Sequence, residues 1–169
     1  MPPITVLLEK LAAAGVQVPA GPVRADGYGD SAELSNELIE LIRTGPKRAG
    51  TSLLWAMEID GDAMPRVGDL EIVVDHNHEP VLLTRITRVD VLPFNEVSAE
   101  YAAIEGEGDG SLEYWRQGHW RFFSRECARV GLEPKPDMPV VCSVFELLAA
   151  VPRGAAQPFV QPDPLRQGP

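Results

Sequence analysis

The spacing of apolar and polar positions predicts three helices. Apolar residues recur at helical intervals over residues 4–14 and again over residues 34–42. Asp30-Ser-Ala-Glu33 before the second segment is typical of a capped helix start, and Gly45 is a typical stop. The longest helical pattern covers residues 111–130. We therefore expect a short N-terminal helix, a second helix that ends at Gly45, and a long third helix.

Four other segments are extended in character. They are rich in β-branched or alternating apolar residues and are bounded by turn sequences. The predicted strands are 51–59, 70–74, 81–92 and 140–148. The turn at 75–79 carries two histidines flanked by acids, and with no third ligand cluster nearby we interpret it as a plain hairpin turn, not a metal site.

The order of these segments indicates one α+β domain. Hairpins without repeated strand-helix-strand units favour a small, curved antiparallel β-barrel flanked by helices. Residues 1–26 are interpreted as the N-terminal helix and a linker rich in proline and glycine, and residues 27–151 as the domain. Residues 152–169 lack periodicity and are predicted to be a disordered tail.

Composition narrows the classes of function. The chain has 169 residues, 44% of them hydrophobic, which suits a single core. Its formal charge of −10 argues against a grip on long nucleic acid through many phosphates. Cys127 and Cys142 have no metal-type spacing, and no leader or membrane-length apolar run is present. We expect a cytoplasmic protein with reduced thiols, no membrane partner and no cofactor.

The turn Gly45-Pro-Lys47-Arg carries the clearest candidate chemistry. It places a cation between the end of a helix and the start of a strand, a geometry that suits a pocket for an anion or polar ligand. The alternative is that the turn simply ends the helix, and that its basic residues only stabilise the partial negative charge at the helix C-terminus.

Two acids, Glu105 and Glu107, lie in a glycine-rich loop further along the chain. A lysine with a lowered pKa that accepts a proton, and a sheltered carboxyl with a raised pKa that donates one, would suit hydrolysis of an amide or phosphodiester. The alternative is a solvated acidic loop.

Other polar and aromatic residues are weaker candidates. Arg85 shares a strand face with apolar neighbours, so we expect either an ion pair with an acid such as Glu105 or a contact to phosphate or base. Of the aromatic residues we expect only Trp55 in the cleft, since aromatic residues at helical spacing are more often core. His119 and Ser124 are interpreted as structural.

Several separated motifs occur in an order that resembles the ASCH family. They span residues 27–148 and comprise Gly29-Asp-Ser31, Gly45-Pro-Lys-Arg-Ala49, Ser52-Leu-Leu-Trp-Ala56, Val67-Gly-Asp69, the strand around Arg85, Val91-Leu-Pro-Phe94, Glu105-Gly-Glu-Gly-Asp109, Leu112, Tyr114-Trp-Arg116, His119-Trp120 and Asp137-Met-Pro-Val-Val-Cys142. The resemblance, to the longer bacterial branch, implies a PUA-like β-barrel whose cleft beside the Gly-x-Lys turn binds RNA or nucleosides.

The same resemblance implies two hydrolytic activities. Some members resemble ribonucleases, and a short branch hydrolyses the amide of N4-acetylcytidine through a Gly-x-Lys-x-x-Thr pattern, with lysine as base, threonine as nucleophile and a later glutamate as proton donor. Gly45, Lys47 and Glu105 match this pattern, but Gly50 stands at the threonine position. Thr51 comes one residue later, and Ser52 shares the strand face of Gly50.

The leading hypothesis is an RNA- or nucleoside-binding ASCH protein with an added hydrolytic activity, a ribonuclease-type cleavage of single-stranded RNA. Its catalytic candidates are Lys47, Glu105 and Ser52, and its substrate-binding candidates are Arg85, Trp55, Thr51 and Glu107. One alternative is an amidohydrolase for N4-acetylcytidine-like nucleosides. Another is a non-catalytic nucleotide-binding module whose N-terminal helix docks a partner or a second copy in a homodimer.

Overall fold

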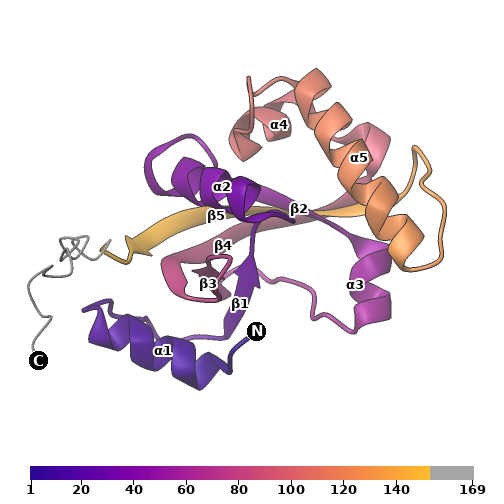
Figure 1. The fold of residues 1–169 in the computed structure, drawn as a ribbon. Helices are drawn as coiled ribbons and strands as arrows, with labels where there is room; N and C mark the ends of the chain where they lie inside the picture. The colour runs from indigo at the N-terminus through magenta and orange to yellow at the C-terminus, as the bar shows by residue number, and fades with distance from the viewer. Residues whose placement is uncertain (153–169) are drawn as a thin grey trace, which may run out of the picture.

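A curled five-stranded sheet lies at the centre of the computed structural model, which describes residues 1–152 (Figure 1). The strand order is β1-β3-β4-β5-β2, in which β1 pairs parallel to β3 and the other neighbours are antiparallel. The strands are β1 Val23–Gly27, β2 Ala49–Leu53, β3 Leu70–Val74, β4 Pro80–Pro93 and β5 Pro139–Ala150. The sheet forms a half-barrel, and the predicted α+β class is confirmed.

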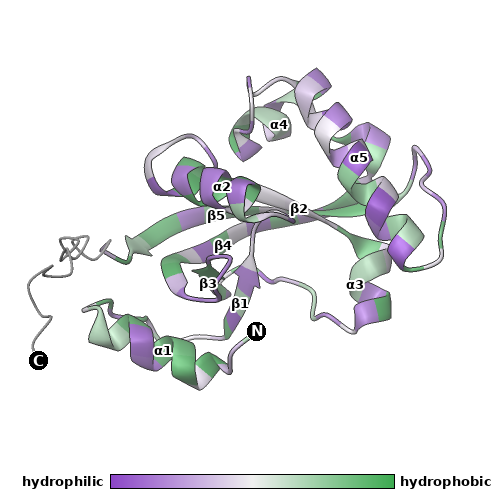
Figure 2. Ribbon diagram, viewed as in Figure 1, coloured by the Kyte–Doolittle hydropathy of each residue, from purple (hydrophilic) through white to green (hydrophobic). Residues whose placement is uncertain are grey.

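Helices cover both faces of the sheet. Helix α1 lies on one side, whereas α2, α4 and α5 lie on the other (Figure 1). The helices are α1 Ile4–Ala13, α2 Ala32–Thr44, α3 Leu54–Asp60, α4 Ala99–Glu105 and α5 Leu112–Arg129, with a 3₁₀ turn η1 at Phe94–Glu96. Figure 2 shows hydrophobic and hydrophilic residues alternating around these helices, as expected for helices that each bury one face.

Alternation along β3 assigns its side chains to the two faces. Leu70, Ile72 and Val74 pack in the cluster that contains Leu7 and Leu11 of α1. Val73 belongs instead to the cluster with Ile39 and Ile42 of α2. Glu71, which alternates with the α1-facing residues, therefore faces the α2 side together with Val73.

Local signals in the sequence placed most elements correctly. The predicted cap at Ser31 is confirmed, because its hydroxyl accepts a hydrogen bond from the Leu34 amide at 3.1 Å. The predicted hairpin turn joins β3 to β4, with the Asp75 carboxylate accepting from two turn amides. Among the described residues, no helix has the length and apolarity needed to cross a bilayer. Apart from residue 152, the predicted tail lies outside the described residues.

Two predicted segments were wrong. The predicted linker contains strand β1, which its proline- and glycine-rich composition did not predict. This strand is stabilised by the hydrogen bonds of its parallel ladder with β3. The predicted strand over 51–59 ends at Leu53, and α3 follows until Gly61 caps it in the left-handed conformation. Trp55 and its neighbours have no strand partner in this region, and α3 buries Ala56 and Met57 instead.

The end of α4 lies directly against the turn that carries Lys47. Gly106 caps α4 with a φ of 66°, and a Cβ atom there would lie 2.8 Å from the Pro46 carbonyl carbon. The Arg48 amide donates to the Ile104 carbonyl at 2.9 Å. This close approach holds the lysine turn beside the acidic end of α4.

Gly106→Ala should therefore destabilise the protein by about 2–4 kcal/mol, because it adds backbone overlap to the cost of a left-handed alanine. Gly110→Ala is the matched control, since Gly110 has a φ of 73° but nothing within 4 Å of a Cβ atom. The control should lose only about 1–2 kcal/mol. Urea unfolding measures both losses, and equal losses would contradict the proposed close approach.

Candidate functional site

A cavity of about 490 Å³ opens on the α2 side of the sheet. Its volume lies in the range of small-molecule sites, roughly 300–1,000 Å³. Side chains from the ends of several elements line it, among them Arg24, Tyr28, Lys47, Thr51, Glu71, Glu105, Glu107 and His119. The cavity therefore collects ionisable groups that are far apart in sequence.

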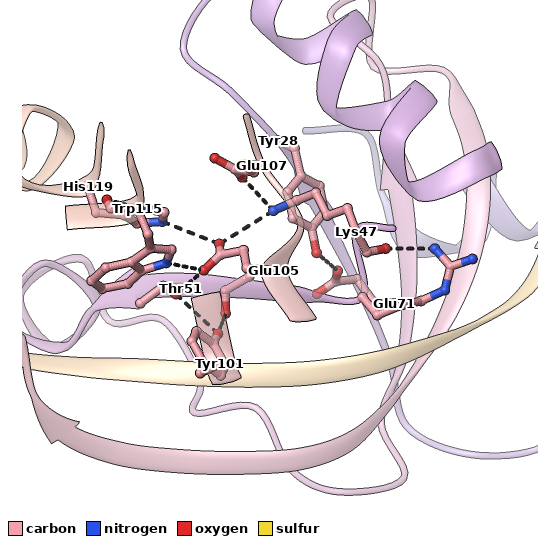
Figure 3. Close-up of polar contacts among 11 residues, drawn as sticks. Tyr28, Lys47, Thr51, Glu71, Tyr101, Glu105, Glu107, Trp115 and His119 are labelled. Atoms are coloured by element: carbon pink, nitrogen blue, oxygen red, sulfur yellow. Dashed lines mark hydrogen bonds and ion pairs between the residues drawn. The ribbon is translucent and has the colours of Figure 1, made fainter. Parts of the chain in front are cut away.

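Lys47 is almost completely buried at the wall of this cavity, with 1% of its surface exposed. Its Nζ lies 2.5 Å from Glu107 Oε1 and 3.4 Å from Glu105 Oε1 (Figure 3). The same ammonium lies 5.4 Å from the centre of the Tyr28 ring, within cation–π range. The structure thus brings together the lysine and both acids that the sequence analysis singled out.

Glu105 accepts hydrogen bonds from several donors at once. Trp115 Nε1 donates to its Oε2 at 2.6 Å and Thr51 Oγ1 donates to the same oxygen at 2.8 Å. Burial alone would raise the pKa of Glu105, but Lys47, His119 and the Trp115 hydrogen bond outweigh burial and hold that pKa well below its usual range. Our expectation of a raised pKa was wrong for Glu105, which is a carboxylate at neutral pH.

His119 belongs to the same cluster. Its Nε2 lies 3.3 Å from Glu105 Oε1 and its Nδ1 lies 3.0 Å from the Trp115 carbonyl oxygen. Both partners only accept hydrogen bonds, so this placement favours the imidazolium form of His119, in which both ring nitrogens donate. Burial lowers the pKa of His119, but the charge of Glu105 more than offsets this and raises it. A carbonyl and a carboxylate partner agree with the structural interpretation of His119, but sequence reasoning did not place this residue at the cavity. The four-residue spacing of Trp115 and His119 on one helix was a usable signal.

Glu71 is a second buried acid in the cavity, and sequence reasoning did not identify it. Tyr28 donates to its Oε1 at 3.1 Å, and Arg24 Nε lies 3.5 Å from its Oε2. Burial and the nearby charge of Asp26 raise the pKa of Glu71 to about 7, against the opposing effect of Arg24. The sequence did contain a signal for this role, since Glu71 is an acid within an otherwise apolar strand. A buried acid needs polar partners, so it marks a polar site.

Thr51, and not Ser52, contacts the charged cluster. The Thr51 hydroxyl donates to Glu105 and lies 3.1 Å from the Tyr101 hydroxyl. Ser52 lines the cavity with an exposed side chain, but its hydroxyl does not contact Glu105. Gly50 lies beneath the Tyr28 ring, where a Cβ atom would be 3.2 Å from a ring carbon. A larger side chain at residue 50 would therefore press against the Tyr28 ring.

Comparison with known proteins shows the family and supports the fold. The family model for the ASCH domain matches residues 24–149. The chain belongs to the ASCH family. An ASCH domain from Lactobacillus crispatus JV V101 is 35% identical with a TM-score of 0.73, over 85% of this chain and 92% of that one. A protein from Enterococcus faecalis V583 is 31% identical with a TM-score of 0.72, over 88% and 89% of the two chains. No curated protein matches.

Two predicted residues lie outside the cavity of this ASCH domain. Arg85 Nη1 pairs with Glu146 Oε1 at 3.1 Å on an exposed part of the sheet. It lies opposite Leu70 in the ladder and so faces the α1 side, whereas its neighbour Ile86 lines the cavity. Trp55 packs against the hydrophobic core from α3. The expected convergence of Arg85 and Trp55 with Lys47 was therefore wrong.

Glu71 makes the stability of the ASCH domain depend on pH. Its pKa rises from 4.5 to about 7 on folding, so the folded state holds a proton that the unfolded state has already released. Stability therefore falls as pH rises from 4.5 to 7, by about 3 kcal/mol in total. The raised pKa of His119 acts in the same direction from about pH 6.5 upward.

Glu71→Gln should reduce the loss of thermal stability between pH 5 and pH 8, because the amide carries no titrating charge. Scanning calorimetry at several pH values measures this difference in Tm. Glu146→Gln is the control, since Glu146 is half exposed and paired only with Arg85. A Glu71→Gln profile that is parallel to the wild-type profile would refute the assignment.

Proposed function

We propose that this ASCH protein binds a nucleoside unit of single-stranded RNA in the cavity beside Lys47. The observation that carries the proposal is a buried ammonium at the wall of a small polar cavity, with the Tyr28 ring beside it. A base offers ring faces and carbonyl oxygens, and the cavity offers an aromatic ring and hydrogen-bond donors. Membership of the ASCH family supports the same class of ligand.

The negative net charge of the protein favours contact with a short stretch of RNA over contact with a long one. The chain is acidic overall, so long nucleic acid gains little from its general field. At Lys47, however, the Glu107 carboxylate lies in a glycine-rich loop and is 24% exposed. A carbonyl or phosphate oxygen of the ligand that reaches Lys47 would replace this carboxylate as its partner.

Lys47→Met should weaken binding of a labelled single-stranded RNA by about 10–100-fold, the worth of a charge-assisted hydrogen bond. Fluorescence polarisation measures the affinity, and circular dichroism checks that the variant is folded. Lys10→Met is the matched control, because Lys10 is an exposed lysine of α1 paired with Glu79. Equal affinities for the wild type and folded Lys47→Met would refute a role for this cavity.

Hydrolysis is the second function that we propose, and the Thr51 contact favours it. The Thr51 hydroxyl already donates its proton toward the Glu105 carboxylate, which in turn lies beside Lys47. With an amide such as N4-acetylcytidine, Thr51 Oγ would bond to the acyl carbon while the C–N bond breaks and the leaving amine takes a proton. Water would then release acetate from Thr51.

The two carboxyl groups of the cavity divide the proton chemistry. Glu105 is held ionised and, because its pKa is lowered, it is a weak base that suits orienting the Thr51 hydroxyl, whereas Glu71 has a pKa of about 7 and suits accepting and donating a proton at neutral pH. We therefore assign the proton-donor role to Glu71 in place of Glu105. Ribonuclease-type cleavage, in which a 2′-hydroxyl attacks phosphorus, would need the same pair of functions.

Thr51→Val should lower acyl hydrolysis by about 100-fold or more, since it keeps the shape of the side chain and removes the nucleophile. Chromatography that detects cytidine and acetate released from N4-acetylcytidine measures the rate. Ser52→Ala is the control and should retain the wild-type rate. Cyclic phosphate ends released from RNA would indicate ribonuclease-type cleavage instead. If the wild type yields neither product, binding alone remains as the function.

A further inference from the structure

Helix α5 presents a second lining surface to the cavity, separate from the Lys47 cluster. Tyr114, Gly118, Arg121 and Phe122 all line the cavity and recur at helical spacing, so they form one face of the helix. None of them takes part in the ion pairs around Glu105. We call these four residues the α5 face.

Gly118 leaves an open space on the α5 face. Glycine is among the least favourable residues in a helix interior, yet no atom of another part of the protein lies within 4 Å of a Cβ atom built there. Close packing therefore does not require glycine. Helical side chains lean toward the N-terminus, so a side chain at residue 118 would cover the turn that carries Tyr114.

Two aromatic rings flank this open space. Tyr114 is 46% exposed and its ring rests on the backbone of Gly108, where a Cβ atom would lie 2.3 Å from ring carbons. Phe122 is partly buried, and the Arg125 guanidinium lies 5.8 Å from its ring centre. Eight residues separate the two rings, about 12 Å along a helix axis. The space is therefore wide enough for a planar base.

Arg121 supplies a cation that no acid neutralises. Along the same side of α5, Arg125 pairs with Asp30 and Arg129 pairs with Asp60. Arg121 is exposed and makes no ion pair within residues 1–152. An unneutralised guanidinium beside the exposed Tyr114 ring and the partly buried Phe122 ring is a combination that suits single-stranded nucleic acid, since bases stack and phosphates need a cation.

We infer that the α5 face is a second nucleotide subsite, in which the neighbouring base of a single-stranded RNA stacks over Gly118 and its phosphate contacts Arg121. The inference rests on the proposed function and names its substrate as an oligonucleotide, not a free nucleoside. Continuity with the Lys47 cavity supports this occupant, because both surfaces line the same cavity.

The test compares the four nucleoside 5′-monophosphates with a mixed-sequence hexanucleotide. The hexanucleotide should bind the wild type more tightly, and Gly118→Leu should shrink that advantage by about 5–100-fold, the value of one stacked base. Ala128→Leu is the matched control, because Ala128 is exposed on α5 and does not line the cavity. It should keep the full advantage.

Two further readouts test the inference even if Gly118→Leu were misfolded. Arg121→Gln should reduce the salt slope of hexanucleotide binding by about 0.7, the contribution of one phosphate contact. Gly118→Ala should raise the Tm by roughly 2–4 °C, because glycine is not needed for packing.

The outcomes separate this inference from the proposed function. If Lys47→Met weakens binding but Gly118→Leu and Arg121→Gln leave the hexanucleotide advantage and the salt slope unchanged, the second subsite is refuted and the Lys47 cavity stands. A Gly118→Ala variant with a lowered Tm would also overturn the inference, since glycine would then serve packing. If the wild type binds neither ligand, both proposals fall.

Discussion

The buried contact between Lys47 and Glu105 constrains the rest of the domain. Their side chains are 1% and 2% exposed, and a buried charge without a partner costs several kcal/mol. The turn after α2 and the end of α4 must therefore meet, and Gly106 permits their backbones to touch. His119 adds a second cation and Glu107 a second carboxylate, so the cluster is close to electrically neutral. Charge balance and backbone proximity thus hold the cavity wall in place together.

The cavity contains two buried carboxyl groups, Glu105 and Glu71, and burial alone would raise the pKa of both. Glu105 has Lys47 and His119 beside it, so it remains ionised. At Glu71, burial and the nearby acid Asp26 raise the pKa into the neutral range, and Arg24 offsets this only in part. One cavity therefore offers a fixed negative charge and a group that gains or loses a proton near neutral pH. The proposed ligand binding and hydrolysis would use these two groups.

Strand alternation decides how the side chains of β2 and β4 are placed around the cavity. On β2 it directs Thr51 toward Glu105, and on β4 it directs Arg85 away from the cavity while Ile86 faces it. A shift of one residue exchanges these roles, because successive side chains point to opposite faces. Two glycines shape the cavity by having no side chain. Gly50 leaves room for the Tyr28 ring, and Gly118 leaves an open space on α5, where we propose that a base stacks.

Elements with strong local signals can be predicted from the sequence alone: the capped start of α2 at Ser31, the hairpin at Asp75, the long α5 and the cationic turn at Lys47. Short-range hydrogen bonds and periodicity dictate these features, so they are visible along the chain. Three other features became visible only in the folded domain: residues 23–27 form a strand, Glu71 and His119 line the cavity, and Arg85 does not. Those outcomes depend on ladder register and on contacts between residues far apart in sequence, which local patterns do not encode.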